Sequence, residues 1–258
     1  MNDSRVRRQI FDALNSALAV PGDPATEPPP VSAPPLAPNE RVTRLTELMT
    51  AIRTEVHLTQ SDAWLQVLEQ VLTDKQVRSL TYGPESILAP AIETAWKAAK
   101  DSSLPALVPY DQAIEDFKER LFQIDAGITT TLGAVADVGA IIIWPDAKEP
   151  RLLSLVPPIH IAVLEASAID DNLIEAMARL KWPQGMPTNA LLISGPSKTA
   201  DIEFKLVFGV HGPKEMVVII ITDQEASASR RLYSRSKSRM ERAGQEKIDA
   251  DFEITTTA

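Results

Sequence analysis

Residues 194–221 read SGPSKTADIEFKLVFGVHGPKEMVVIII, a stretch in which two glycine–proline turns alternate with runs of Val, Ile and Leu. Gly and Pro are typical of turns, and short apolar runs between turns are typical of buried strands. The turns also gather hydroxyl, carboxylate and imidazole side chains where strands are expected to end. Such hydroxyls and exposed backbone N–H groups can hold an anion, so we interpret the stretch as the rim of a ligand site.

The first turn is defined as residues 194–199, and the second turn as residues 209–213. Their hydroxyls and backbone N–H groups are hydrogen-bond donors, and Lys198 adds a positive charge. His211 lies where a strand meets a turn, which makes it a candidate for contact with a ligand. The substrate-binding candidates are Ser194, Gly195, Ser197, Lys198, Thr199, Glu203, His160 and Gly212, and the catalytic candidates are His211 and Asp201.

A structural interpretation of the same residues stays open. Residues 195–196 can make a tight turn, with Ser197 or Thr199 capping a following helix. Asp201 and Glu203 can be first-turn carboxylates that complement a helix dipole, or a general base and a metal ligand respectively. We favour ligand contact because the turn is expected at the end of a strand.

The chain contains three histidines. His57 is expected on a strand, in a structural or exposed role. His160 lies between two isoleucines, so on a strand its side chain points away from them, and a functional and a core role are both open. A metal site built from His160, His211 and Asp201 would lack any local ligand spacing such as His-x-x-x-His, so no metal is expected.

Composition excludes several classes of function. With 258 residues and 44% hydrophobic content, the chain is expected to form one main domain with an appendage. The absence of cysteine excludes a disulfide framework, a thiolate nucleophile and an iron–sulfur cluster bound by this chain. A net charge of −9 opposes binding to nucleic acid. The basic segment 230–242 is interpreted as a solvated helix that complements an acidic body or partner, with nucleic-acid binding as the alternative.

Sequence motifs narrow the location and the chemistry further. The longest apolar runs are far shorter than the roughly 20 residues that a membrane helix needs, and the amino terminus lacks the continuous apolar core of a secretory signal. No membrane span is therefore expected, and a cytoplasmic location is. No dinucleotide-binding, P-loop or nucleophile-elbow motif is present.

The pattern predicts three regions. Residues 1–20 are expected to form an amphipathic helix, which either docks on a partner or folds back onto its own domain. Residues 21–39 are expected to be a linker, because eight of the 20 prolines fall between Pro21 and Pro38. Residues 40–258 are expected to form an α/β domain with a basic carboxyl-terminal segment.

Within that domain, helices and strands are predicted to alternate. The helices are expected over about 39–55, from Ser61 through Leu72, over 84–100 and over 111–122. The strands are expected over 77–82, 106–109, 140–144, 159–164, 190–193 and 216–221. Continuous apolar runs favour a three-layer α/β fold with an open, largely parallel sheet. Ligands of such sheets bind at the carboxyl ends of the strands, so we expect the first turn there.

Several segments resemble the LUD-domain family, of the lactate utilization protein C type. The resemblance covers roughly residues 40–222. It departs from the family at Val138 and Ala140, where relatives usually carry Thr or Ser, which puts hydroxyl-dependent contacts there in doubt. The matching segments are Gly195–Glu203, Gly209–Pro213, Gly127–Thr129, Ala136–Gly139, Ala140–Trp144 and Arg151–Val163.

The resemblance implies a fold related to the sugar-phosphate isomerase and CoA-transferase group. It also implies an accessory or substrate-binding component of bacterial L-lactate oxidation, whose iron–sulfur clusters reside on partner subunits and which binds no cofactor itself. Ser194, Ser197, Lys198 and Thr199 would then hold the lactate carboxylate, and His211 or Asp201 would accept the hydroxyl proton. The alternatives are a free-standing enzyme for a phosphorylated or CoA-linked small molecule, and a non-catalytic interaction module.

Overall fold

The computed structural model describes residues 8, 11–12, 35–99, 104–185, 188–200 and 206–222 of the 258-residue chain. Contacts divide the chain into two units, Met1–Pro35 and Leu36–Ala258. In the first unit, Arg8, Phe11 and Asp12 are helical. Outside the described residues lie the rest of the predicted amino-terminal helix, linker residues 21–34, the basic segment 230–242 and the candidates Asp201 and Glu203.

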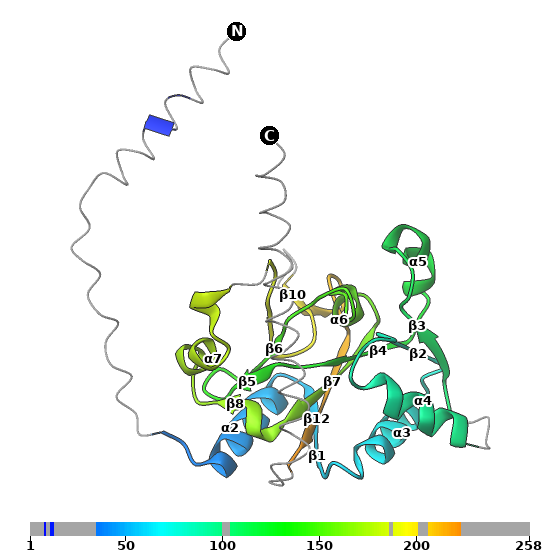
Figure 1. Ribbon diagram of the computed structural model, residues 1–258, viewed down its shortest axis with the longest axis horizontal. Coiled ribbons are helices and arrows are strands. Elements are labelled where there is room, and N and C mark those ends of the chain that lie inside the picture. Colours follow the sequence, from blue (N-terminus) through cyan, green and yellow to red (C-terminus); the bar gives the residue numbers. More distant parts are fainter. Residues whose placement is uncertain are drawn as a thin grey trace, which may run out of the picture. The chain divides into compact units, whose positions relative to one another are not determined.

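The second unit is built on a sheet of six parallel strands, in the order β1 (Thr54–Thr59), β12 (Glu215–Ile221), β7 (Ile159–Glu165), β4 (Ala126–Thr130), β2 (Ser79–Tyr82) and β3 (Ala106–Pro109) (Figure 1). Two neighbouring inner strands, β7 and β12, are runs of buried and mostly apolar residues. Parallel strands that are covered on both faces usually have this composition. The predicted open, largely parallel α/β sheet is confirmed.

One face of this sheet is covered by helices α3 (Trp64–Asp74) and α4 (Ala89–Ala98). Leu68 of α3 and Ile92 of α4 belong to one buried cluster with alternate strand residues such as Ile219. Both helices were predicted from apolar residues at helical spacing, and both begin a few residues later than expected.

The other face is covered by helix α2 (Pro38–Ala51) and by a second sheet, whose strands lie in the order β8 (Ile169–Asp170), β5 (Gly133–Val135), β6 (Ala140–Ile143) and β9 (Leu191–Ile193). The prediction that strands 140–144 and 190–193 belong to the parallel sheet is therefore wrong. β6 pairs antiparallel with both β5 and β9. Only residues 136–139 join β5 to β6, and a connection that short allows a hairpin but not a parallel crossover.

The remaining elements pack around these layers. Helix α7 (Leu173–Arg179) covers the outer face of the second sheet, where Ala176 is buried with residues of β5 and β6. Helices α5 (Ile114–Leu121) and α6 (Leu152–Leu155) share a smaller cluster next to β3. The short elements are η1 (Ala166–Ala168), η2 (Trp182–Gln184) and the hairpin strands β10 (Lys198–Ala200) and β11 (Leu206–Phe208).

Two boundary predictions are wrong for local reasons. The helix expected over 39–55 ends at Ala51, because Arg53 adopts a left-handed φ of 72° and Thr54 begins β1. No helix follows the first turn. Residues 198–200 form β10, which pairs antiparallel with β11. Ser197 and Thr199 therefore do not cap a helix, which was the structural alternative for this turn.

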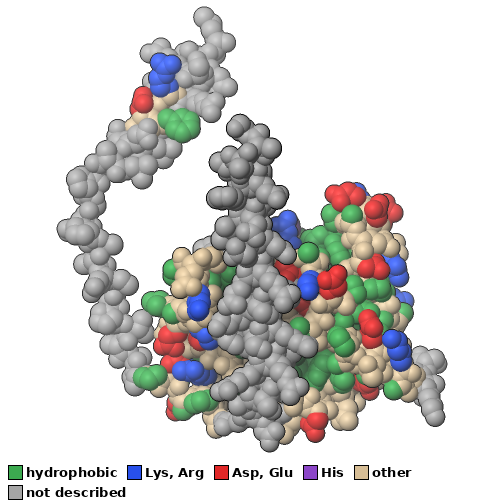
Figure 2. Space-filling view, viewed as in Figure 1, with side chains coloured by type: hydrophobic (Ala, Val, Ile, Leu, Met, Phe, Trp, Pro, Cys, Tyr) green, Lys and Arg blue, Asp and Glu red, His purple; other side chains and the backbone are tan. Residues whose placement is uncertain are grey.

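The exposed surface of α5 is weakly acidic, because its three exposed carboxylates outnumber its two exposed cations, Lys118 and Arg120. Glu115, Asp116 and Glu119 are exposed on this helix, and Figure 2 shows acidic side chains gathered over it. Phe122 follows the helix and is 74% exposed. This surface suits a cationic or polar partner better than an anionic one.

Among the described residues, no helix is long and apolar enough to span a membrane.

A largely buried ion pair ties α7 to the second sheet and to the segments beside it. Nε and Nη2 of Arg179 donate to the Asp170 carboxylate at 2.9 and 2.7 Å. The same guanidinium donates to the carbonyl oxygens of Leu132 at 3.2 Å and of Ala168 at 3.1 Å. Arginine suits this site because its planar guanidinium can donate to the carboxylate and to both carbonyl oxygens at once. The compact ammonium group of a lysine could not reach all three acceptors.

The substitution Arg179→Ala is expected to lower the free energy of unfolding by about 3 kcal/mol, because it leaves the largely buried Asp170 carboxylate without its cation. Urea unfolding followed by circular dichroism measures this. The matched control is Arg44→Ala, since Arg44 is exposed on α2, and its effect should stay within about 0.5 kcal/mol. Equal effects of the two substitutions would contradict the role given to Arg179.

Candidate functional site

The two turns lie at the amino end of the parallel sheet. Thr54, the first residue of β1, donates from its hydroxyl to the Ser194 carbonyl oxygen at 3.2 Å. Gly195 lies against the side chain of Ile52, just before β1. The second turn directly precedes β12. The expectation that the first turn lies at the carboxyl ends of the main strands is therefore wrong, because β9, which leads into it, belongs to the second sheet.

The fold brings the two turns into direct contact. The Ser197 N–H donates to the Pro213 carbonyl oxygen at 2.9 Å, and the Gly209 N–H donates to the Ser197 carbonyl oxygen at 2.9 Å. A side chain on Gly212 would bring its Cβ to 3.1 Å from the Ser197 Cβ, so glycine allows this close approach. The two turns thus form one surface.

Several candidates in these turns are accessible. Ser194, Lys198 and His211 are exposed, and Ser197 and Thr199 are half-buried. Hydroxyls, a cation and an imidazole therefore face solvent on one surface, which is the chemistry that recognises a small organic anion. Whether these residues bind a ligand stays a prediction, and Asp201 and Glu203 lie outside the described residues.

His160 belongs to the core. It is 1% exposed on β7, and its Nε2 lies 2.9 Å from the Thr129 hydroxyl. Its Nδ1 has no hydrogen-bond partner among the described residues. Burial lowers the pKa of His160 to about 4, so the imidazole is neutral near pH 7. No hydrogen bond joins it to the described residues of either turn, which separates it from the exposed candidates.

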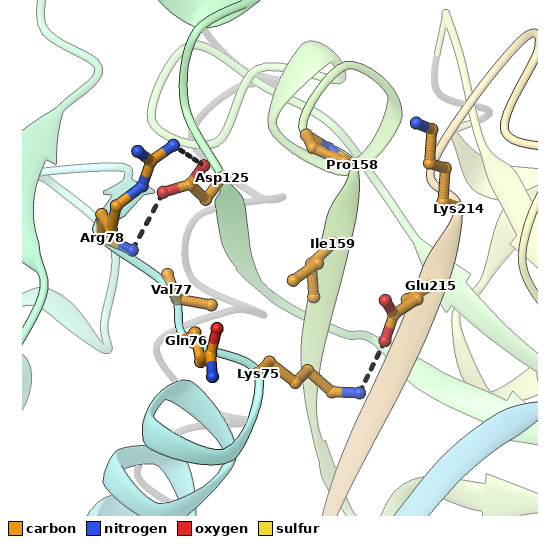
Figure 3. Close-up of a pocket in the computed structure, with 9 residues that line it drawn as sticks. All are labelled: Lys75, Gln76, Val77, Arg78, Asp125, Pro158, Ile159, Lys214 and Glu215. Atoms are coloured by element: carbon orange, nitrogen blue, oxygen red, sulfur yellow. Dashed lines mark hydrogen bonds and ion pairs between the residues drawn. The ribbon is translucent and has the colours of Figure 1, made fainter.

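A groove of about 550 Å³ lies next to the second turn, also at the amino end of the main sheet (Figure 3). One of the residues that line the groove, Lys214, directly follows the second turn in the sequence. The N–H groups of Lys214 and Glu215 both donate to the Pro158 carbonyl oxygen, at 2.8 and 3.1 Å, which fixes β12 beside β7 at this point. The groove is lined by Lys75, Gln76, Val77, Arg78, Asp125, Pro158, Ile159, Lys214 and Glu215.

Ion pairs occupy both ends of the groove. Lys75 Nζ lies 2.7 Å from Glu215 Oε2 and 2.7 Å from Glu55 Oε2. Burial opposes the charge of Lys75, but the two carboxylates outweigh it and raise its pKa. At the other end, Asp125 accepts from the Arg78 N–H at 2.9 Å, and contacts with Arg78 and Ser79 outweigh burial and lower the pKa of Asp125.

The middle of the groove is apolar, and its charged ends carry three cations and two carboxylates. In Figure 3, Ile159 lies between the two charged ends. The Arg78 side chain is 86% exposed, and Lys214 is exposed. A short ligand with an apolar body and one carboxylate fits this pattern. The sequence reasoning missed this groove, and its one sequence signal was the Pro157-Pro158 pair before β7.

Two further features of the sequence can be placed. Val138 is 54% exposed in the connection between β5 and β6, and Ala140 is buried in β6. Neither residue lines the groove. Among the residues that the structure describes, no three His, Asp or Glu side chains are grouped as metal ligands would be.

The buried imidazole predicts a pH dependence. The pKa of His160 is lowered from its ordinary value of 6.5 to about 4, so the unfolded chain binds a proton between these values and the folded chain does not. The contribution of the neutral imidazole to the free energy of unfolding is therefore fully present above pH 6.5. The free energy of unfolding falls by up to about 3 kcal/mol as the pH drops to 4. His160→Gln should flatten this fall in urea unfolding from pH 7 to 4.

The matched control is His211→Gln, since His211 is exposed in the second turn. His57, on the edge strand β1, is unsuitable because its Nε2 lies 2.6 Å from Glu55 Oε1 and, against the effect of burial, helps to lower the pKa of that carboxyl. The His211→Gln variant should keep the wild-type difference in stability between pH 6.5 and 4. If His160→Gln keeps that difference as well, His160 is not the titrating group.

Comparison with known proteins gives the family. The LUD domain model matches residues 42–221. The chain is 33% identical to uncharacterized protein NMB1437 of Neisseria meningitidis serogroup B, over 73% of this chain and 80% of that protein. It is 30% identical to lactate utilization protein C 1 of Bacillus mycoides, over 73% of this chain and 82% of that protein.

Among solved structures, a DUF162 family protein from Deinococcus radiodurans matches with 18% identity and a TM-score of 0.49, covering 72% of this chain and 99% of that one. The family model spans every strand from β1 to β12 and both turns. The family resemblance seen in the sequence is thereby confirmed, and the chain belongs to the LUD-domain family.

Proposed function

We propose that this protein is a component of a lactate utilization system, in which it binds L-lactate and assembles with redox partners. The observation that supports this proposal is that the two turns are hydrogen-bonded to each other and form one accessible surface within a LUD domain. Relatives named lactate utilization protein C align with the chain over about four fifths of their length, which supports the same system.

In this proposal the amino-end surface holds the substrate. Lys198 and the hydroxyls of Ser194, Ser197 and Thr199 bind the carboxylate of lactate through charge-assisted hydrogen bonds. The exposed imidazole of His211, or the carboxylate of Asp201, accepts the hydroxyl proton when lactate is oxidised to pyruvate. The methyl group of lactate is small enough to need only a shallow apolar contact.

In this proposal the electrons released by the oxidation of lactate pass to a partner protein. Oxidation of lactate to pyruvate breaks the hydroxyl O–H bond, whose proton goes to His211 or Asp201, and the C2–H bond, whose hydrogen and electron pair pass to a redox group of a partner protein. This chain has no cysteine to ligate an iron–sulfur cluster. We therefore propose that the chain is an accessory or substrate-binding subunit that works in the cytoplasm with iron–sulfur partner proteins. The weakly acidic surface of α5 with the exposed Phe122 is available for such an assembly.

Binding and growth test the proposal together. Lys198→Ala and Ser197→Ala should each weaken the binding of L-lactate to the purified protein about tenfold, because each removes a donor to the carboxylate. Isothermal titration measures this, and growth on lactate of a deletion strain carrying the same variants should slow in step. Lys97→Ala on α4 is the matched control, since its side chain is 80% exposed and lies on neither proposed surface, and it should leave both unchanged.

A free-standing enzyme for a phosphorylated or CoA-linked molecule is the alternative, because exposed hydroxyls and Lys198 would also suit a phosphate. Titration with inorganic phosphate separates the two. Tighter binding of phosphate than of lactate, or unimpaired growth on lactate in the deletion strain, would overturn the proposal. Iron–sulfur proteins that co-purify with the tagged chain from its host would support it.

A further inference from the structure

A buried carboxyl group lies at the opposite end of the parallel sheet. Glu149 is only 6% exposed, at the carboxyl ends of β2 and β4. The Ser86 hydroxyl lies 2.5 Å from its Oε1, and the Thr130 N–H donates to both carboxyl oxygens at 3.2 and 3.3 Å. The Thr130 hydroxyl donates to Oε2. Two hydroxyls and one backbone N–H therefore converge on a single carboxylate.

The donors are held in place before any ligand is considered. Thr130 is the last residue of β4, so its N–H direction is fixed by the sheet. The Ser86 hydroxyl accepts from the Leu88 N–H at 3.2 Å, which leaves its own proton free for the carboxylate. We name these donors, Ser86 Oγ and Thr130 N and Oγ1, the carboxylate cradle.

The cradle lies where the order of the strands reverses. From β2 the chain continues outward to β3, whereas from β4 it continues through β7 in the opposite direction. Open α/β sheets bind ligands outside the carboxyl ends of their strands at such a switch point. In this chain the position between β2 and β4 is filled by residues 146–150.

That segment is a compact turn pressed onto the sheet. Asp146 Oδ1 accepts from the N–H groups of Lys148 and Glu149 at 2.8 and 2.9 Å. The Lys148 carbonyl oxygen lies so close to Gly83, just after β2, that any Cβ there would collide with it. The turn carries its own hydrogen bonds, so it can leave the cradle as one unit.

The cradle is electrically neutral. The nearby Lys148 Nζ lies 3.7 Å from Glu85, at the surface, and no cation hydrogen-bonds to Glu149 among the described residues. Burial raises the pKa of Glu149 against the effect of its donors. A phosphate dianion without a cation would be far more costly to bury here than one carboxylate. The cradle therefore selects a small monocarboxylate.

We propose that Ser86 and Thr130 form a binding site for a small monocarboxylate, and that Glu149 occupies this site as an internal ligand until an external carboxylate displaces it. The site lies at the opposite end of the strands from the two turns and the groove. It is independent of the function proposed above, since neither its residues nor its test involves the amino-end surface.

Thermal unfolding with acetate as the probe tests the site. Glu149→Ala empties the cradle, so acetate should stabilise this variant with a midpoint concentration at least tenfold lower than for the wild type, where Glu149 competes. Adding Thr130→Val to Glu149→Ala should abolish the effect. Glu93→Ala, which removes another carboxylate near β2, should respond to acetate like the wild type. Inorganic phosphate at equal ionic strength should stabilise all of them to the same extent, through its general exclusion from protein surfaces, and should show no preference for Glu149→Ala.

Hydrogen exchange on the wild type tests the displacement and does not need the variant to fold. At saturating acetate the amides of residues 146–150 should exchange at least threefold faster than in chloride of equal ionic strength. Unchanged exchange would show that Glu149 is a permanent structural side chain and would overturn the proposal. An equal acetate response in all variants, or a stronger response of Glu149→Ala to phosphate than to acetate, would overturn it as well.

Discussion

The burial of β7 and β12 on both faces is the constraint on which the rest of the structure depends. Successive residues of a strand point to opposite faces, so a run such as Met216 to Ile221 needs two apolar covers. Helices α3 and α4 supply one cover, and the second sheet with α2 supplies the other. With both faces closed, the two ends of the parallel strands are where the groove and the candidate residues lie.

The two ends differ in their chemistry. The amino end carries the two turns and a groove at which Arg78 and Lys214 are exposed, so it can neutralise an incoming anion. The carboxyl end holds Glu149 with neutral donors alone. An acidic chain with a net charge of −9 repels anions at long range, so recognition of a carboxylate requires such local donors.

Local pattern predicted the elements better than their partners. The runs 106–109, 159–164 and 216–221 were predicted as strands, and each is one. The membership of β6 and β9 in a second sheet depends on long-range pairing, which apolar runs do not encode. The groove draws its lining from four separate parts of the chain, and Glu149 is a single carboxylate in a loop. Neither the groove nor Glu149 forms a sequence motif. Of the candidate sites, the sequence alone therefore predicted only the two turns.

The histidines show how burial decides a role that sequence left open. An imidazole that accepts a substrate proton must be reachable by the substrate and must titrate near the working pH. His160 meets neither condition, because it is buried and its pKa is lowered to about 4. His211 is exposed in the second turn, next to Gly212 and its contact with Ser197. Of these two histidines, His211 is the one that a ligand at the amino end can reach, while His160 lies in the core beside the Thr129 hydroxyl.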